Sequence, residues 1–311
     1  MGKKLAVVGS DNCYHLGSKA YLVRDDGLYH SAKKIYKVKD GVYRLVFGGG
    51  VDVGAMVIGY SAAGGMQDAG VVTMGDGKQY RLLTLTKSGT LTVPEEVQAE
   101  VWMCGGGVDG IGGDPLNTDA SCGGAGSHIA TGALKLAKSN VAVIGAGNNG
   151  LSSFGGLQNK ESAGKNGGTG GGGLTAGGTG DGVDKHPFAD SVYFPDAHCG
   201  GGAAGATATL IMPPAQTKSG GNGGTNGGSG KTGTAGSSLP VSGGVGGVKG
   251  GGSGGNVTNM TTFTSGQDAT FYGSGGGGGA LTTSTAGNKS SAGGAGYQGV
   301  IYIRIPVEQA A

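Results

Sequence analysis

The sequence predicts an all-β protein: a small N-terminal β-meander, then further strands interleaved with glycine-rich segments that pack as polyglycine II helices and carry aromatic loops. Three observations predict this class. Strand-like segments alternate apolar and polar residues and end at turn residues. Glycine supplies 76 of 311 residues, against a usual share of about 7%. Helical periodicity is confined to one short candidate, residues 133–138.

Residues 1–47 contain a two-fold repeat that predicts hairpins. The first unit spans residues 19–29 and the second 34–43; each alternates apolar and polar residues, turns at Asp-Gly and resumes with an aromatic residue. Asp-Gly tolerates the positive φ angles of tight hairpin turns. We therefore expect a meander of three or four strands that ends at residues 43–47. Such a module is too small to be very stable alone.

A second group of strands is expected after a connecting segment, residues 48–79. Residues 80–86 and 90–94 flank a Lys-Ser-Gly turn and form the clearest strand pair in the chain. We assign residues 80–306 to one glycine-rich domain and residues 307–311 to a tail. Further strands are expected at residues 99–104, 141–144 and 299–305, with a weaker candidate at 210–212.

Glycine tracts separate these strands, at residues 105–113, 164–182, 219–236, 243–255 and 273–279. As flexible linkers they would behave as random coil, but such linkers seldom recur between the strands of one domain. In the third tract glycine recurs every third residue from Gly221 to Gly236. Three residues per turn is the period of an extended helix of the polyproline II type. Because this helix has no internal hydrogen bonds, we expect a bundle that is held by lateral backbone bonds.

The composition excludes several classes of protein. With 22 Lys and Arg against 20 Asp and Glu, the net charge is +2, which fits neither a basic nucleic-acid binder nor a charged disordered tail. Only 8 prolines exclude a collagen helix. No run approaches the length of a membrane span, and the basic start lacks the apolar stretch of a signal peptide. We therefore expect reduced cysteines.

Two motifs resemble nucleotide-binding sites but lack the structural context that such sites need. Residues 141–150 match a strand followed by G-x-G-x-x-G, yet residues 151–156 break the helix that must follow. Residues 230–232 resemble the end of a P-loop, but Thr225 stands where the first glycine is required, and no strand precedes it. We expect no nucleotide site.

Catalytic and metal-binding patterns are also missing from the sequence. The histidines show no zinc-ligand spacing. His198 beside Cys199, with Cys104 or Cys122, is a metal alternative that no spacing supports. No Ser/His/Asp order or close carboxylate pair stands out. We expect a protein that is not an enzyme and that holds no cofactor or metal.

Bulky residues of the second half gather in loops between glycine tracts, chiefly residues 184–198 and 260–272. Rigid rings on a scaffold of small residues are typical of recognition surfaces, because they offer contact area at low entropic cost. The alternative is that these rings close the ends of a core; for Tyr193 and Phe194 we weigh the two equally, and for Phe271 and Tyr272 we favour the core. The candidate receptor-contact residues are His186, Phe188, Tyr193, Phe194, His198 and Phe263.

The order of several segments resembles the glycine-rich domain of tail-fibre and tail-tip proteins of tailed bacteriophages. The resemblance covers about residues 80–306, and glycine tracts interrupted by Lys, Asn and Thr depart from it. It implies a β-sandwich with polyglycine helices packed beside it, presented at the distal end of the tail to bind the host surface. The segments that carry it are residues 88–94, 99–107, 145–147, 152–155 and 296–304.

We therefore expect a non-enzymatic protein of the virion tail, assembled in the host cytoplasm, that recognises the bacterial surface through loops on a polyglycine scaffold. The receptor is a glycan or a protein, and we expect no nucleic-acid partner and no membrane insertion. Residues 1–47 are expected to attach the chain to other tail proteins. A homotrimer is the first expectation, since fibres are commonly trimeric, with a single-copy tip as the alternative.

Three other interpretations remain open. A purely architectural virion component would use the glycine tracts as spacers and bind no receptor. A glycine-rich ligand-binding module of the receptor-kinase type shares the sheet-and-polyglycine design, but the missing signal peptide and unpaired cysteines weigh against it. An ice-binding polyglycine protein needs an almost uninterrupted three-residue repeat, which the strand-rich half lacks.

Overall fold

The computed structural model resolves into two compact units, residues 1–56 with 307–311 and residues 57–306. Among the described residues, the elements are β-strands apart from one 3-10 turn, η1 (Pro187–Ala189). The predicted all-β class is confirmed. The structure describes residues 5–8, 13–16, 19–23, 29–32, 34–39, 42–48, 52–112, 122–160, 186–210, 216–218, 235–236, 239–247, 250–285 and 287–307.

The N-terminal unit is built from antiparallel hairpins. Strands β1 (Leu5–Val8), β2 (Cys13–Leu16), β3 (Lys19–Val23) and β4 (Tyr29–Ala32) form one sheet in chain order. Strands β5 (Lys34–Lys39) and β6 (Val42–Gly48) pair separately across the second Asp-Gly. The hairpins that the two Asp-Gly repeats predict are therefore present.

The larger unit contains three five-stranded sheets and a hairpin, β19 (Val257–Asn259) with β20 (Thr262–Phe263). The β13 sheet has the order β15 (Leu157–Gln158), β14 (Ser153–Phe154), β13 (Ser139–Val143), β10 (Gly89–Thr92), β7 (Gly59–Tyr60). The β11 sheet has the order β12 (Ile129–Leu136), β11 (Val97–Cys104), β23 (Val300–Pro306), β9 (Gln79–Leu85), β8 (Met66–Thr73). The β16 sheet has the order β18 (Ala235–Gly236), β17 (Gln216–Lys218), β16 (Thr207–Leu210), β21 (Leu281–Ser284), β22 (Gly287–Ser290).

Strand β23 lies at the centre of the β11 sheet, between β11 and β9. Its sequence is a nearly continuous apolar run, and Ile301, Ile303 and Ile305 are completely buried. Such a run is expected of a strand with neighbours on both sides and cover on its faces. Trp102 of β11 lies opposite Tyr302 in this register. The closing segment of the chain is thus the core strand of the sheet.

Three predictions about these strands are wrong. Segments 80–86 and 90–94 form strands, but β9 and β10 belong to different sheets, because β9 pairs with β8 and β23 while β10 pairs with β7 and β13. Residues 133–138, the helix candidate, fall largely in β12, where pairing with β11 over eight residues overrides helix propensity. Within 48–79, predicted as a connection, β7 and β8 are integral strands of the two sheets, and the boundary between units follows Met56.

Extended segments without strand assignment run through the larger unit; we call them the glycine array. Each bonds laterally to others through backbone N–H and C=O groups. The predicted tract at 164–182 lies outside the described residues, and so does the tract at 219–236 apart from residues 235–236. The segments of the array are residues 105–112, 122–128, 144–152, 199–206, 241–247, 250–256, 264–270, 273–280 and 291–299.

The segment from Gly273 to Ala280 lies at the centre of this array. Along it, the bonding partner recurs every third residue: Gly275 and Gly278 donate to the segment 199–206, whereas Gly276 and Gly279 donate to 105–112. Its carbonyl groups accept hydrogen bonds from three further segments, each of which donates at every third residue. The N–H of Gly277 donates to a sixth segment. Among the described residues, this one segment therefore bonds to six neighbours. The donor-to-acceptor distances fall between 2.7 and 3.0 Å.

Glycine is required where these backbones meet. A Cβ on Gly276 would lie 2.0 Å from the carbonyl oxygen of Gly294, and one on Gly110 would lie 2.0 Å from that of Gly277. Ordering glycine costs about 0.5–1 kcal/mol more per residue than ordering alanine. A net gain of about 1 kcal/mol per backbone hydrogen bond offsets this cost when most segments are bonded on several sides.

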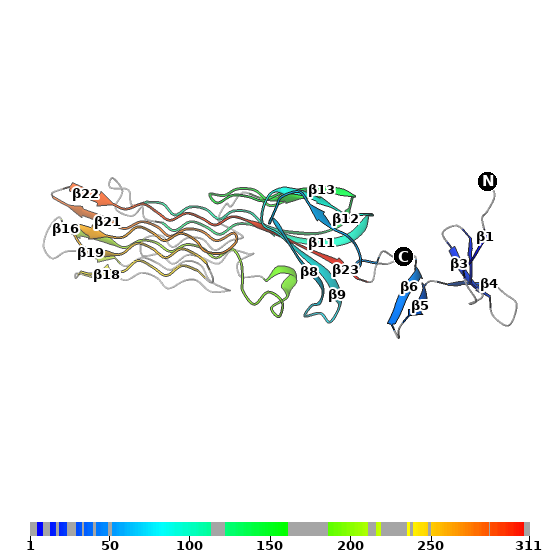
Figure 1. Ribbon diagram of the computed structural model, residues 1–311. Coiled ribbons are helices and arrows are strands. Elements are labelled where there is room, and N and C mark those ends of the chain that lie inside the picture. The colour runs from blue at the N-terminus through cyan, green and yellow to red at the C-terminus, as the bar shows by residue number, and fades with distance from the viewer. Residues whose placement is uncertain are drawn as a thin grey trace. The chain divides into compact units, whose positions relative to one another are not determined.

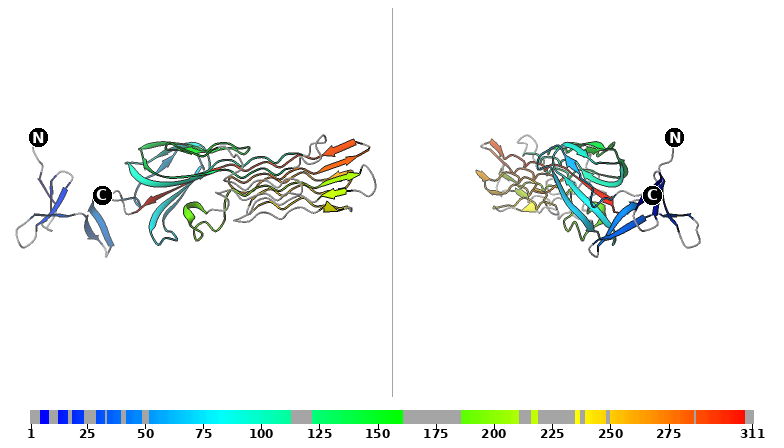
Figure 2. Two further views of the ribbon diagram at one scale, coloured as in Figure 1. Left: turned by 180° about the vertical axis from the view of Figure 1, so that it is seen from behind. Right: turned by 45° about the vertical axis from the view of Figure 1, so that its right-hand side comes forward.

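Within the larger unit, the array connects two ends of different construction (Figures 1 and 2). The β11 and β13 sheets lie at one end, and the β16 sheet with the β19–β20 hairpin lies at the other. Each end has an apolar cluster. One surrounds Trp102 and Tyr302, and the smaller one contains Ala206, Val257 and Ala280.

Candidate functional site

Residues 186–198, which we call the aromatic loop, are fixed against the β11 sheet. The buried carboxylate of Asp190 accepts two backbone hydrogen bonds of 2.6 Å, from the N–H of Gly75 and from that of Tyr193. Gly75 lies in the turn between β8 and β9. Hydrogen bonds to an ionised acceptor are roughly twice as strong as neutral ones. The loop is therefore held in one position at its middle.

A second anchor is the stack around Arg304 of β23. Its guanidinium carbon lies 4.4 Å from the ring centroid of Tyr80 and 4.6 Å from that of Phe188. The same group forms an ion pair with Glu100, with 2.7 Å between Nη2 and Oε2. Cation–π contacts of a largely buried arginine contribute about 0.5–2 kcal/mol. Phe188 therefore covers a charged side chain and holds the first half of the loop on the sheet.

The backbone of this region is strained. Phe188 has φ 55°, Ala189 φ 56° and Cys199, directly after the loop, φ 62°. Non-glycine residues reach this left-handed region at a cost of roughly 1–2 kcal/mol each. Strain of this kind persists only where surrounding packing determines the conformation, and it clusters at functional sites. The anchors at Asp190 and Arg304 supply that packing.

His198 and Tyr302 form the polar centre of the cluster beneath the loop. His198 Nε2 lies 2.9 Å from the Tyr302 hydroxyl, and the imidazole meets Trp102 edge to face with ring centroids 5.1 Å apart. Burial, and then the nearby His186, lowers the pKa of His198 to about 3. Burial also raises the pKa of Tyr302. At neutral pH the imidazole is thus uncharged, and its Nε2 shares one hydrogen bond with the Tyr302 hydroxyl, which is a structural arrangement.

The structure separates the candidate contact residues into two groups. Phe194 is 7% exposed and His198 1%, and both lie in the cluster around Trp102, so the prediction that these two contact a receptor is wrong for the folded chain. Their rings are needed to cover β11 and β23. His186, Phe188 and Tyr193 are half-buried in the loop. Phe263 is half-buried at the other end of the array, against the cluster of Val257.

The most exposed parts of the aromatic loop are residues that the sequence did not single out. Val192 is 78% exposed, and Ala189, Ser191 and Pro195 are exposed beside it. Residues 191–193 form a turn. Asp190-Ser191 is a turn signal that places Val192 at a loop tip. An exposed valine on a fixed loop next to the half-buried Tyr193 makes a small apolar contact surface.

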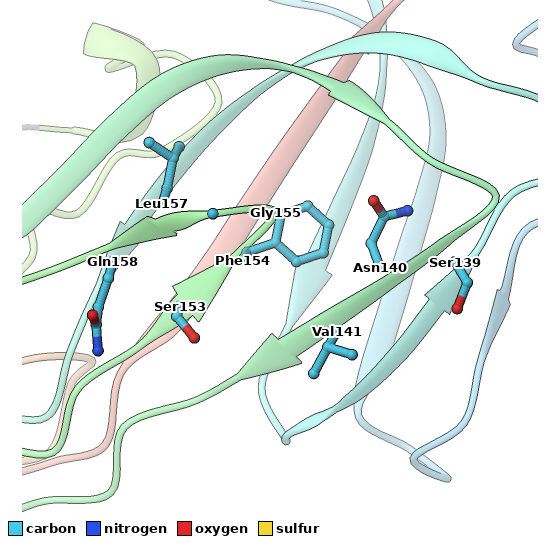
Figure 3. Close-up of a pocket in the computed structure, with 9 residues that line it drawn as sticks. Ser139, Asn140, Val141, Ser153, Phe154, Gly155, Leu157 and Gln158 are labelled. Atoms are coloured by element: carbon cyan, nitrogen blue, oxygen red, sulfur yellow. The ribbon is translucent and has the colours of Figure 1, made fainter.

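A pocket lies beside strand β13. The pocket has a volume of about 460 Å³ and is lined by uncharged residues (Figure 3). Val141 is 66% exposed at this place, whereas Phe154 is buried. The sequence marks 141–144 only as a strand. The lining residues are Ser139, Asn140, Val141, Ser153, Phe154, Gly155, Gly156, Leu157 and Gln158.

No helix follows the G-x-G-x-x-G motif. Residues 144–152 belong to the glycine array, where the N–H of Gly106 bonds to the carbonyl of Gly150 at 2.8 Å. A Cβ on Gly145 would lie 2.0 Å from the same carbonyl oxygen. These glycines thus serve close backbone packing. Within the described residues, no three His, Cys, Asp or Glu side chains are grouped to hold a metal ion.

No family model, curated protein or solved structure matches this chain. In the described part of the chain, no helix has the length and apolar character of a membrane span.

Proposed function

We propose that this chain is a tail protein of a tailed bacteriophage, of the fibre or tail-tip type, that binds the host cell surface. Loops on a scaffold of polyglycine II helices beside a β-sandwich make the contact. Its place is then the virion tail, and residues 1–47 attach it to other tail proteins. A homotrimer is the assembly that we propose.

The observation that carries this proposal is the bonding of the segment 273–280. A partner that recurs every third residue fits a helix of three residues per turn, which is the polyglycine II geometry. With six neighbours around it, the segment offers a partner neither side chains nor free backbone groups. The centre of the array is therefore closed to a partner, and we propose that the loops at its two ends make the contact.

Of the two ends of the array, the end with the aromatic loop has the better supported contact surface. It is fixed before binding by Asp190 and Arg304, so a partner does not have to order it. Such preorganisation lowers the entropic cost of association. Its surface combines Val192 with the half-buried Tyr193 and Phe188. The hairpin with Phe263 is a second surface at the far end of the unit.

The test is saturable binding of the labelled full chain to a panel of bacterial cells and cell-envelope fractions. We expect binding to at least one strain, and loss of at least about tenfold in affinity in the double variant Val192→Asp, Tyr193→Ser. The matched control is Val245→Asp, since Val245 is 64% exposed on the array. Trp102 is the single tryptophan and is buried, so its fluorescence reports whether each variant folds.

Two outcomes contradict parts of this proposal. If no strain or envelope fraction binds the chain saturably, the architectural alternative replaces the adhesive function. If binding occurs but both variants bind like the unmodified chain, the aromatic loop is not the contact surface. The single variant Phe263→Ser in the β19–β20 hairpin then tests the other end.

A further inference from the structure

Two cysteines share one small region where the glycine array meets the β11 sheet. Cys104 is the last residue of β11, and Cys199 directly follows the aromatic loop. Both side chains are thiols and both are completely buried. Both also belong to the apolar cluster that surrounds Trp102 and Tyr302. Two thiols that lie far apart in the sequence are therefore placed in the same cluster.

Gly273 locates the two sulfur atoms. A Cβ on Gly273 would lie 2.8 Å from Sγ of Cys199 and 3.0 Å from Sγ of Cys104. Because both distances start at one point, the sulfur atoms are no further apart than the sum of the two. Gly273 has a φ angle of 70°, which glycine adopts without steric cost. The absence of a side chain at this residue therefore leaves room for the two thiols to approach each other.

The backbone holds the two cysteines differently. Cys104 ends a strand that pairs with β12 on one side and with β23 on the other. The N–H of Cys199 donates to the carbonyl of Tyr272 at 3.2 Å, but Cys199 itself has φ 62° and ends a strained loop. Strained loop ends belong to the parts of a protein that open locally at low cost. One thiol thus lies on a fixed strand, and the other lies where the chain can shift.

Burial alone would make these residues small apolar side chains, which is the common role of a core cysteine. The difference is that two sulfur atoms meet here, whereas Cys122 lies elsewhere along the array. A Cβ on Gly278 would lie 2.8 Å from the backbone of Cys122. Gly278 follows Gly273 in the same extended segment, about 15 Å further on at about 3.1 Å per residue. Cys122 is therefore a natural control for the pair.

We propose that Cys104 and Cys199 form an oxidation site, at which the folded chain makes a disulfide when it meets a small-molecule disulfide. The Cys199 thiolate attacks one sulfur of that reagent, forms a mixed disulfide and releases the first thiol. The Cys104 thiolate then attacks the Cys199 sulfur, forms the protein disulfide and releases the second thiol. The two cysteines together lose two electrons and two protons, which the reagent takes up as it becomes two thiols.

The new bond joins strand β11 to the end of the aromatic loop. It closes residues 104–199 into one covalent loop, and a long closed loop restricts the unfolded chain more than a short one. A buried thiol does not react until it is exposed, so local opening at Cys199 admits the reagent. The pair is then reduced in a cytosol and oxidised in an oxidising medium. This inference goes beyond the proposed function and does not depend on host binding.

The test uses the full chain with Cys122→Ser, so that Cys104 is the one cysteine left in the tryptic peptide 88–135. The folded, reduced protein is incubated with roughly 5 mM 2-hydroxyethyl disulfide at about pH 8, and remaining thiols are then alkylated. We expect mass spectrometry to find peptide 88–135 joined to peptide 186–218, which contains Cys199. The oxidised protein should unfold at a temperature higher by roughly 5 °C or more, and dithiothreitol should reverse both effects.

Cys199→Ala in the same background is the matched control, and Cys104→Ala is a second one at the other end of the bond. Both should show neither the joined peptide nor the shift in unfolding temperature, with folding checked by circular dichroism. No joined peptide from the folded chain within a day overturns the proposal. So does a mixed disulfide that persists on Cys199, since Cys104 is then out of reach. A joined peptide that forms in concentrated urea and not in the folded chain also overturns it.

Discussion

Asp190 and Gly75 are joined by a hydrogen bond of 2.6 Å between a buried carboxylate oxygen and a backbone N–H, 115 residues apart in the chain. The bond fixes the middle of the aromatic loop to the turn between β8 and β9. The second oxygen of the same carboxylate holds the turn at Tyr193. One side chain thus determines both the place and the shape of the loop.

Replacing Asp190 by alanine should free the aromatic loop. Two backbone N–H groups lose a charged acceptor, which costs about 2–4 kcal/mol in the free energy of unfolding. Because the strained residues Phe188 and Ala189 then lose their support, we also expect faster proteolysis within residues 186–198. Urea unfolding and limited proteolysis measure the two effects. The exposed Ser191→Ala is the control, and equal proteolysis of both variants would contradict the anchoring role.

Alanine at the centre of the glycine array should destabilise the protein strongly. In Gly276→Ala the new Cβ meets the carbonyl oxygen of Gly294 at 2.0 Å, so backbones must separate and hydrogen bonds break. We expect a loss of about 3 kcal/mol or more in the free energy of unfolding. Gly112→Ala is the matched control, since its nearest atom lies at 3.0 Å and its cost should stay within about 1 kcal/mol. Equal losses for the two would show that the array is not tightly packed.

Acidification should destabilise the protein through His198. Its pKa is about 3 in the folded chain, against an ordinary value of 6.5, so between these values only the unfolded chain binds the proton. Stability is therefore complete above pH 6.5 and falls as the pH is lowered, by about 2 kcal/mol at pH 5. In His198→Gln, we expect the loss in the free energy of unfolding between pH 7.5 and 5 to be smaller by that amount. Parallel stability profiles of the two proteins would contradict the assignment.

Glycine in place of Ala189 should leave the protein as stable as before or stabilise it by up to about 1 kcal/mol. The reason is that Ala189 has φ 56°, and relief of this strain exceeds the entropic cost of glycine. Ala133→Gly, at an exposed position of β12, is the control and should cost about 0.5–1 kcal/mol. Thermal unfolding distinguishes the two signs. A loss at Ala189 as large as that at Ala133 would show that the loop backbone is unstrained.

Much of the candidate site could not be predicted, because its residues are placed by distant partners. Phe194 and Tyr193 are neighbours in the sequence with similar side chains, yet one lies in the core and the other partly at the surface. Strand β13 pairs with β14 at only two residues, and where that pairing stops is encoded by no single segment. The strand pair expected around residue 88 fails for the same reason, since the chain crosses there between two sheets.

By itself the sequence determined the all-β class, the Asp-Gly hairpins and the need for tight backbone packing, since these follow from local turn chemistry, apolar alternation and the absence of side chains. Only the tertiary structure decided which strands pair and which rings are buried. The physical reason is that backbone hydrogen bonds look alike at every residue. Their partners are selected by the packing of segments such as 105–112, 199–206 and 273–280, which meet only in the folded chain.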